Sequence, residues 1–175
     1  MSEWQAAVAA MRRGDTVGAA GCAIVLGAGG RVGSAFARRL HDDGFLVLTD
    51  PADPVTVARA AAPAYLFDCA YADGDPAGHV ERVVRHLTDW RDYAGIFVPS
   101  SGWIDSDSDY ARAKRAVEAL VAFYAALGAP VVTDRIGYFP GDGVTPDPTE
   151  PMIAQAIDGD TLYARVMARL YQPAR

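Results

Sequence analysis

The sequence is poor in several residue types, and each scarcity narrows what the protein can be. Its 175 residues include no asparagine, two cysteines and a single lysine, Lys114, against fifteen arginines. Cys22 and Cys69 each lie inside an apolar run, with no CxxC pattern or Cys/His cluster nearby. We therefore expect two buried core thiols in a reducing compartment rather than a disulfide framework.

Long hydrophobic runs and an excess of positive charge are also missing. The longest apolar stretch, Cys22 to Ala28, is far too short to span a bilayer, and no signal-peptide pattern opens the chain. The net charge of −6 and the pI near 4.9 argue against a nucleic-acid surface. We expect a cytoplasmic, single-domain protein whose partner is a small molecule, not a membrane or a nucleic acid.

Two patterns resemble metal sites, but their spacing fails. The acidic run Asp105–Asp109 begins like a calcium loop, yet Tyr110 stands where glycine is needed and Ala116 where glutamate is needed. His79 and His86 share a helix face without a third ligand. We expect no metal, a helix cap in the acidic run, and histidines that are packed or solvated.

Apolar runs and amphipathic segments alternate along the chain, which is typical of βαβ units. We expect strands over 22–26, 45–49, 65–69, 96–99 and 130–133. Helices are expected over 3–13, 32–41, 55–62, 79–90, 107–127, 151–157 and 161–171. The fold class is α/β: one doubly wound parallel sheet of about five strands in three α/β/α layers.

A glycine-rich segment, Gly27-Ala28-Gly29-Gly30-Arg31-Val32-Gly33, joins the first strand to the next helix. Glycines there allow a tight turn and a close approach of the backbone to a pyrophosphate at the helix N-terminus. The predicted cofactor-binding residues are Gly27, Gly29, Gly30, Arg31, Val32 and Gly33. The alternative is a glycine-rich turn that binds nothing.

This segment predicts a Rossmann-like, dinucleotide-binding domain over residues 22–143. An N-terminal helix and linker occupy 1–21, and a helical tail over 144–175 is expected to pack on the domain.

Asp50 ends the second predicted strand, 23 residues after Gly27. A carboxylate there accepts hydrogen bonds from the hydroxyls of the adenine ribose and repels a 2′-phosphate, which favours NAD over NADP. Arg31 could offset that preference, so NADP stays an alternative. Asp50 could instead be a helix cap or turn residue before Pro51.

Lys114 follows Tyr110 by four residues, and positions i and i+4 share one face of a helix. A phenol acting as a general acid near neutral pH needs a lowered pKa, which a neighbouring ammonium provides. Lysine also offers donors to a nicotinamide ribose, whereas the planar fork of arginine suits a point contact poorly. The only lysine therefore stands where lysine chemistry would be used.

The glycine segment, Ser100-Ser101, the Tyr110/Lys114 pair and residues 135–143 occur in the order typical of one family. Over residues 22–143 the chain resembles the short-chain dehydrogenase/reductase superfamily, in particular its extended branch of NAD-dependent sugar-nucleotide epimerases and dehydratases. The resemblance implies that Tyr110 is the general acid/base and Lys114 its partner. Ser100 or Ser101 would bind the substrate oxygen, and strand alternation favours Ser101.

The chain departs from that family in four ways. Residues 144–175 are far shorter than the usual substrate lobe, and no strand is expected between Asp50 and Tyr65, where the usual third strand falls. Asparagine, which many members use in a proton relay, is missing, and the spacing from serine to tyrosine is short. The substrate is therefore small, or the tail, the N-terminal helix or a second subunit completes the pocket.

These departures keep two kinds of function open. The first is an NAD(P)-dependent oxidoreductase or epimerase-like enzyme acting on a small hydroxy or keto substrate. The second is non-redox chemistry on the same fold, such as a cyclase, isomerase or lyase, or a dinucleotide-sensing regulator. The resemblance also implies a homodimer, packed through the helices at 79–90 and 107–127.

Overall fold

The computed structural model describes residues 3–13, 20–61, 63–72, 74–140 and 149–171. Five parallel strands form one sheet in the order β2-β1-β3-β4-β5. They are β1 (Cys22–Leu26), β2 (Leu46–Thr49), β3 (Ala64–Asp68), β4 (Gly95–Ser101) and β5 (Val131–Ile136). The predicted five-stranded Rossmann-like α/β fold is therefore confirmed.

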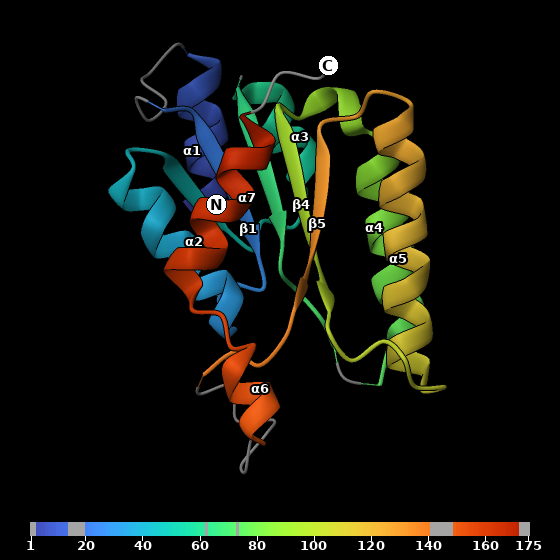
Figure 1. Ribbon diagram of the computed structural model, residues 1–175. Helices are drawn as coiled ribbons and strands as arrows, with labels where there is room; N and C mark the ends of the chain where they lie inside the picture. Colours follow the sequence, from blue (N-terminus) through green and yellow to red (C-terminus); the bar gives the residue numbers. More distant parts are fainter. Residues whose placement is uncertain (1–2, 14–19, 62, 73, 141–148, 172–175) are drawn as a thin grey trace.

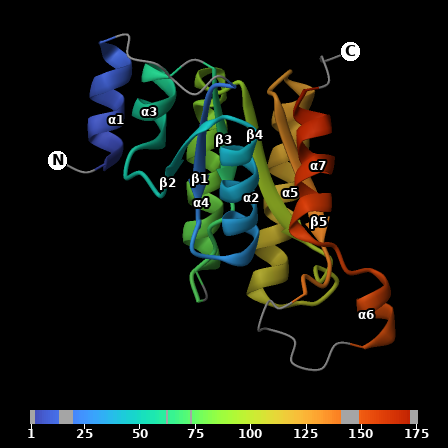
Figure 2. The ribbon, with the colours of Figure 1, turned by 90° about the vertical axis from the view of Figure 1, so that its left-hand side faces the viewer.

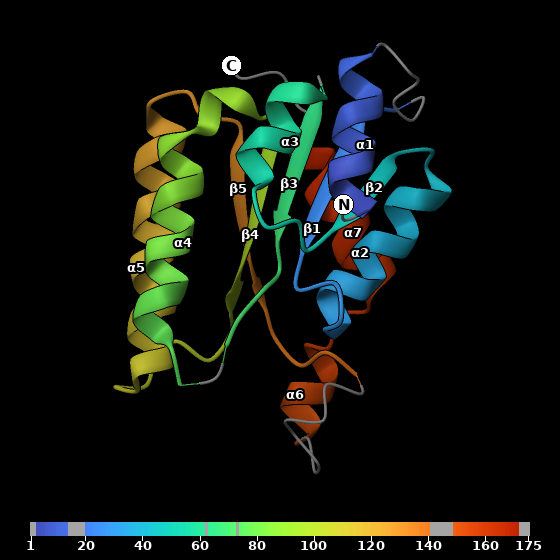
Figure 3. The same ribbon diagram turned by 180° about the vertical axis from the view of Figure 1, so that it is seen from behind.

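Helices cover both faces of the sheet. In Figure 1, α2 (Arg31–Asp42) and α7 (Gly159–Leu170) lie on the near face. Figure 3 shows the other face, where α1 (Glu3–Arg12), α3 (Pro54–Ala60), α4 (Pro76–Thr88) and α5 (Asp109–Ala126) pack. A short 3-10 helix (Trp90–Asp92) leads from α4 toward β4.

The apolar runs of the sequence are buried because helices cover both sides of each central strand. Along β1, Ile24 faces the core under α3 and α4, while Val25 faces the core under α2 and α7. On the second side, Phe36 of α2 stacks on Phe97 of β4, with ring centroids 5.2 Å apart. The predicted tail thus supplies a full helix, α7, to the core beside α2.

The strand order reverses between β1 and β3. From β1 the chain passes through α2 to the edge strand β2, and α3 then carries it back to β3 on the other side of β1. Between β2 and β3 the described chain contains α3 and no strand, as predicted. In doubly wound sheets, ligands bind at such a switch point, outside the carboxyl ends of the strands.

The two ends of the chain extend the fold. Figure 2 shows α1 beside α3, and α6 (Glu150–Ala154) beyond the carboxyl ends of the strands. Residues 14–19 of the predicted linker and residues 141–143 of the family-like segment 135–143 lie outside the described residues. None of the described helices is long and apolar enough to cross a membrane.

The two cysteines are free thiols, as predicted. Cys22 is fully buried in β1, and its burial raises the pKa of the thiol to about 12. Cys69, expected in the core, is only half-buried because it follows β3 at the carboxyl edge of the sheet.

Candidate functional site

The glycine loop (residues 27–33) is held by close backbone packing. Gly27 has φ of +72°, and a Cβ at this position would lie 2.6 Å from the Cα of Ala70. A Cβ at Gly33 would overlap the carbonyl oxygen of Gly27. Gly29, in contrast, has open space where its Cβ would be. Gly27 and Gly33 therefore shape the loop, whereas Gly29 leaves its outer side open.

Helix α2 begins without a side-chain cap. Asp53, Asp75, Ser108 and Asp158 each accept a backbone N–H at the start of α3, α4, α5 and α7. At α2 the N-cap is Gly30, no side chain caps the helix, and its first turn contains no acidic residue. The first N–H groups of a helix have no partner within it, so this end attracts an anion.

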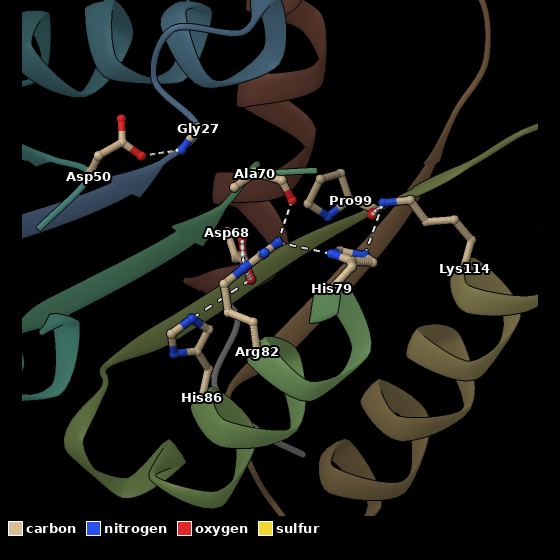
Figure 4. A network of polar contacts seen from close by, with 9 residues as sticks. All are labelled: Gly27, Asp50, Asp68, Ala70, His79, Arg82, His86, Pro99 and Lys114. Atoms are coloured by element: carbon tan, nitrogen blue, oxygen red, sulfur yellow. Dashed lines mark hydrogen bonds and ion pairs between the residues drawn. The ribbon is translucent and has the colours of Figure 1, made fainter. Parts of the chain in front are cut away.

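Asp50 lies beside the glycine loop rather than at a helix start. Its carboxylate accepts hydrogen bonds from the backbone nitrogens of Gly27 (2.6 Å) and Ala28 (3.3 Å), the first of which is drawn in Figure 4. The backbone of Asp50 has φ of +45°, in the left-handed region that aspartate tolerates better than most residues. Asp53, not Asp50, caps α3.

A cleft of about 760 Å³ opens at the carboxyl ends of β4 and β5. Val32, from the first turn of α2, contributes to its lining, as do the four predicted catalytic residues Ser100, Ser101, Tyr110 and Lys114. Tyr71, Trp103 and Phe139 add aromatic walls. The structure thus brings one end of the glycine loop and the predicted Tyr–Lys pair to one cavity.

The two serines differ in their partners. We expected only one of them to face the site, but both line the cleft, which lies at the carboxyl end of β4 where both serines are placed. Ser100 Oγ donates to Glu118 Oε1 (2.6 Å), a carboxylate that Arg135 also binds with two hydrogen bonds of 2.8 Å. Ser101 Oγ accepts the backbone N–H of Trp103 (3.1 Å). The hydroxyl proton of Ser101 can therefore be donated to a substrate.

Lys114 is enclosed among aromatic and polar groups. It is 4% exposed, and its Nζ lies 5.8 Å from the ring centroid of Tyr110 and 5.1 Å from that of Tyr71. The amine donates to the carbonyl oxygen of Pro99 (3.1 Å) and contacts His79 Nε2 (3.2 Å). Burial lowers the pKa of Lys114 to about 8.

Lys114 ends a buried polar chain that crosses from β3 through α4 to α5 (Figure 4). The chain consists of Asp68, Arg82, His79 and Lys114. Asp68 is fully buried at the end of β3, and Arg82 Nε lies 3.0 Å from its carboxylate. Arg82 Nη2 also contacts His79 Nδ1 (2.9 Å) and donates to the carbonyl oxygen of Ala70.

The direction of these hydrogen bonds follows from the donors available. Because arginine can only donate, His79 Nδ1 accepts from Arg82, and the neutral ring carries its proton on Nε2, facing Lys114. Burial, together with the charges of Lys114 and Arg82, lowers the pKa of His79 to about 3, so the ring stays neutral. When neutral, the Lys114 amine can accept a hydrogen bond from the Nε2–H of His79 and donate one to the carbonyl oxygen of Pro99.

The sequence interpretation missed three members of the buried polar chain: Asp68, His79 and Arg82. A signal was present, since His79, Arg82 and His86 are spaced to share one face of α4. His79 and His86 are both buried, so they are packed rather than solvated. Within the described part of the chain, no group of three or more His, Cys, Asp or Glu residues could hold a metal ion.

Solved structures that share this fold include two epimerases. The UDP-N-acetylglucosamine 4-epimerase from Bacillus cereus superposes with a TM-score of 0.59 at 12% identity, over 87% of this chain and 76% of that one. The nucleoside-diphosphate sugar epimerase from Corynebacterium glutamicum superposes with a TM-score of 0.53 at 16% identity. That match covers 94% of this chain but 46% of the epimerase, so the chain spans less than half its length.

No protein-family model matches the sequence, and a search of curated proteins finds no significant match. At 12% and 16% identity, the structural likeness establishes the fold alone.

Proposed function

We propose that the protein binds a nicotinamide dinucleotide at the carboxyl edge of the sheet and oxidises or reduces a small hydroxy or keto substrate in the cleft. The observation that carries this proposal is the shared cavity. Val32 from the start of α2 and the Ser101, Tyr110 and Lys114 side chains line the same 760 Å³ cleft. A dinucleotide on the glycine loop would thus reach the residues able to transfer protons.

The residues of the glycine loop fit such a cofactor. The uncapped start of α2 would hold the pyrophosphate, and the open side of Gly29 leaves room for it. Asp50, beside the loop, would accept hydrogen bonds from the hydroxyls of the adenine ribose, which favours NAD over NADP. Arg31 is exposed at the first position of α2 and keeps NADP as an alternative.

When bound, such a cofactor would supply a hydride, that is, a proton with two electrons, to a carbonyl carbon or take one up from an alcohol carbon. Tyr110 would give the balancing proton to the substrate oxygen in reduction and receive it in oxidation. Ser101 would donate a hydrogen bond to the same oxygen. Lys114 would stabilise the phenolate of Tyr110 whenever the amine carries a proton.

Both structural neighbours bear names of sugar epimerases, which supports epimerase-like or oxidoreductase chemistry for this fold.

Ser100 has a separate part in the proposal, because its hydroxyl proton is engaged by Glu118. It would position α5, the helix that carries Tyr110 and Lys114, against β4.

The proposal is tested by titrating the protein with NADH and NADPH and then measuring carbonyl reduction by Tyr110→Phe. Loss of a general acid is expected to lower kcat by about 100- to 10,000-fold while the Kd for cofactor stays within about twofold. Tyr124→Phe, the same change farther along α5 and outside the cleft lining, should keep both values.

Three results would contradict the proposal. If neither dinucleotide binds, the glycine loop is a turn without a ligand. If the cofactor binds but Tyr110→Phe reduces the carbonyl as fast as the wild type, Tyr110 is not the general acid. If the cofactor binds and the wild type reduces no carbonyl, the protein is a sensor or uses the fold for non-redox chemistry.

A further inference from the structure

The walls of the cleft are mostly aromatic and apolar. Tyr71, Trp103, Tyr110 and Phe139 contribute rings, and Trp103 is 41% exposed, a large apolar surface left open to a ligand. Val32 and Ile136 add aliphatic surface. Surface of this kind binds apolar groups through the hydrophobic effect and aromatic stacking.

Charged groups are scarce in the same cleft. Among the described residues that line it, Lys114 is the only basic residue and Asp109 is the only one with a carboxylate. Lys114 is 96% enclosed, and its amine is directed to His79 and the Pro99 carbonyl. Asp109, whose side chain is exposed, accepts a hydrogen bond from Arg112 Nη2 (2.6 Å) and offers no donor to an anion.

Three arginines near the cleft, Arg112, Arg115 and Arg135, have other partners. Arg112 binds Asp107 and Asp109, and Arg115 donates to backbone carbonyls that include that of Ser106 (2.9 Å). Arg135, beyond Ser100, is engaged by Glu118. Residues 73 and 141–148, which the structure does not describe, contain no lysine or arginine in the sequence.

A phosphate or carboxylate that leaves water needs a cation or several donors to replace its hydration. The described cleft offers neither beyond the enclosed Lys114, whereas its hydroxyl donors, Ser101 and Tyr110, suit a single carbonyl or alcohol oxygen. This lining contrasts with what a nucleotide sugar, with its two phosphates, would require.

We infer that the substrate is an uncharged, largely apolar aldehyde, ketone or secondary alcohol, not a nucleotide sugar or another anion. The inference rests on the proposed function and narrows its substrate. In reduction, the carbonyl π bond breaks, the carbon gains the hydride of NAD(P)H, and the oxygen gains the proton of Tyr110. The products are the alcohol, the oxidised dinucleotide and the phenolate of Tyr110, which regains its proton from water.

A matched pair of aldehydes tests the inference in the full-length protein. Benzaldehyde and 4-carboxybenzaldehyde differ by one carboxylate, and their reduction is followed through NADH or NADPH consumption, with UDP-glucose and UDP-N-acetylglucosamine as competitors. The neutral aldehyde is expected to have at least about a tenfold higher kcat/KM, and neither nucleotide sugar should inhibit. Further neutral aromatic and aliphatic ketones extend the set.

A charge placed at the mouth of the cleft sharpens the test. Ser106 is exposed, lines the cleft and lies outside the proposed catalytic set. Ser106→Arg should raise the ratio of kcat/KM for 4-carboxybenzaldehyde to that for benzaldehyde about tenfold. Ser106→Gln, which adds length without charge, is the control and should leave this ratio unchanged.

The outcomes separate this inference from the proposed function. Cofactor binding with preference for the carboxylate or a nucleotide sugar, or with no turnover of any neutral carbonyl, overturns the inference and leaves the dinucleotide site standing. Absence of cofactor binding overturns the proposed function instead. In that case the cleft is probed by tryptophan emission, which benzaldehyde should quench in the wild type and not in Trp103→Phe. Equal or stronger quenching by 4-carboxybenzaldehyde overturns the inference.

Discussion

The glycine loop and the buried polar chain meet at Ala70, yet they are built in opposite ways. The loop approaches the Cα of Ala70 with the backbone of Gly27, and Arg82 of the polar chain binds the Ala70 carbonyl oxygen. The loop presents backbone groups at an exposed helix end that no side chain caps. The polar chain consists of side chains between α4, α5 and the sheet, of which Asp68, His79 and Lys114 are buried and Arg82 is partly exposed.

This difference determines how each region fails. In the glycine loop, most substitutions are tolerated except where the new Cβ would meet other backbone atoms. A harmful substitution there acts through a local steric clash. In a buried chain, each charge has given up its hydration and depends on the partner beside it. Removing one member therefore destabilises the fold as well as the site.

The largest expected effect is on Arg82 in the polar chain. Arg82→Met leaves the carboxylate of Asp68, which is 0% exposed, without its arginine, and is expected to lower the free energy of unfolding by about 3–5 kcal/mol. Urea denaturation measures the loss. Arg85→Met, on the exposed side of the same helix, should stay within about 0.5 kcal/mol.

A double variant checks the cause. In Asp68→Leu/Arg82→Met both charges are replaced by apolar side chains, so a large part of the stability should return. Additive losses from the two changes would show that the ion pair is not the reason.

The second effect is a pH dependence that arises from Lys114. With a folded pKa of about 8 against an ordinary value of 10.5, the unfolded chain holds a proton that the folded protein lacks between these values. Stability therefore rises with pH over that window, by up to about 3 kcal/mol from this group. The comparison with Lys114→Met isolates this contribution, because the cysteines and tyrosines titrate in both proteins.

Unfolding free energies of wild type and Lys114→Met at pH 7 and pH 10 give the measurement. The wild type should gain relative to the variant as the pH rises. A difference that is constant with pH would mean that Lys114 keeps its proton in the folded protein.

The third effect separates the glycines of the loop. Gly33→Ala forces a Cβ onto the carbonyl oxygen of Gly27 and should lower the free energy of unfolding by about 1–3 kcal/mol. Gly29→Ala, where the Cβ meets open space, is the matched control and should change stability by less than about 0.5 kcal/mol. Equal losses at both positions would contradict the packing described for the loop.

Local patterns predicted the fold well. Apolar runs between turn residues indicated all five strands, and Ser108 caps α5 within the acidic run expected to cap it. The boundaries differ where tertiary packing decides them: β4 continues through Ser101, and α4 begins at Pro76, after the cap Asp75. The hydrophobic periodicity of a sequence reflects which residues are buried. At the ends of β4 and α4, burial depends on neighbouring elements, so the sequence pattern does not mark these boundaries.

The candidate site was predicted only in part. The i, i+4 spacing placed Tyr110 and Lys114 on one face of a helix, and both line the cleft. Where the amine of Lys114 points depends on His79, which α4 supplies 35 residues earlier in the chain. In the sequence, Asp68 follows an apolar run in the way that an ordinary turn residue does. Its partner Arg82 comes beside it only because α4 packs against the end of β3. Such long-range side-chain pairs have no local signature.

The smallest expected effect on stability concerns Asp50, whose carboxylate binds the backbone of the glycine loop. Unlike the charges of the polar chain, it is proposed to act mainly on the choice of cofactor. Asp50→Asn keeps a side-chain oxygen for the Gly27 N–H and tolerates φ of +45°, so stability should fall by no more than about 1 kcal/mol. Removal of the negative charge should nevertheless lower the Kd for NADPH relative to NADH by about tenfold, because a 2′-phosphate is no longer repelled. Asp53→Asn, at the cap of α3, is the control and should leave the ratio unchanged. If Asp50→Asn also leaves the ratio unchanged, the carboxylate only holds the glycine loop, and cofactor preference must come from Arg31.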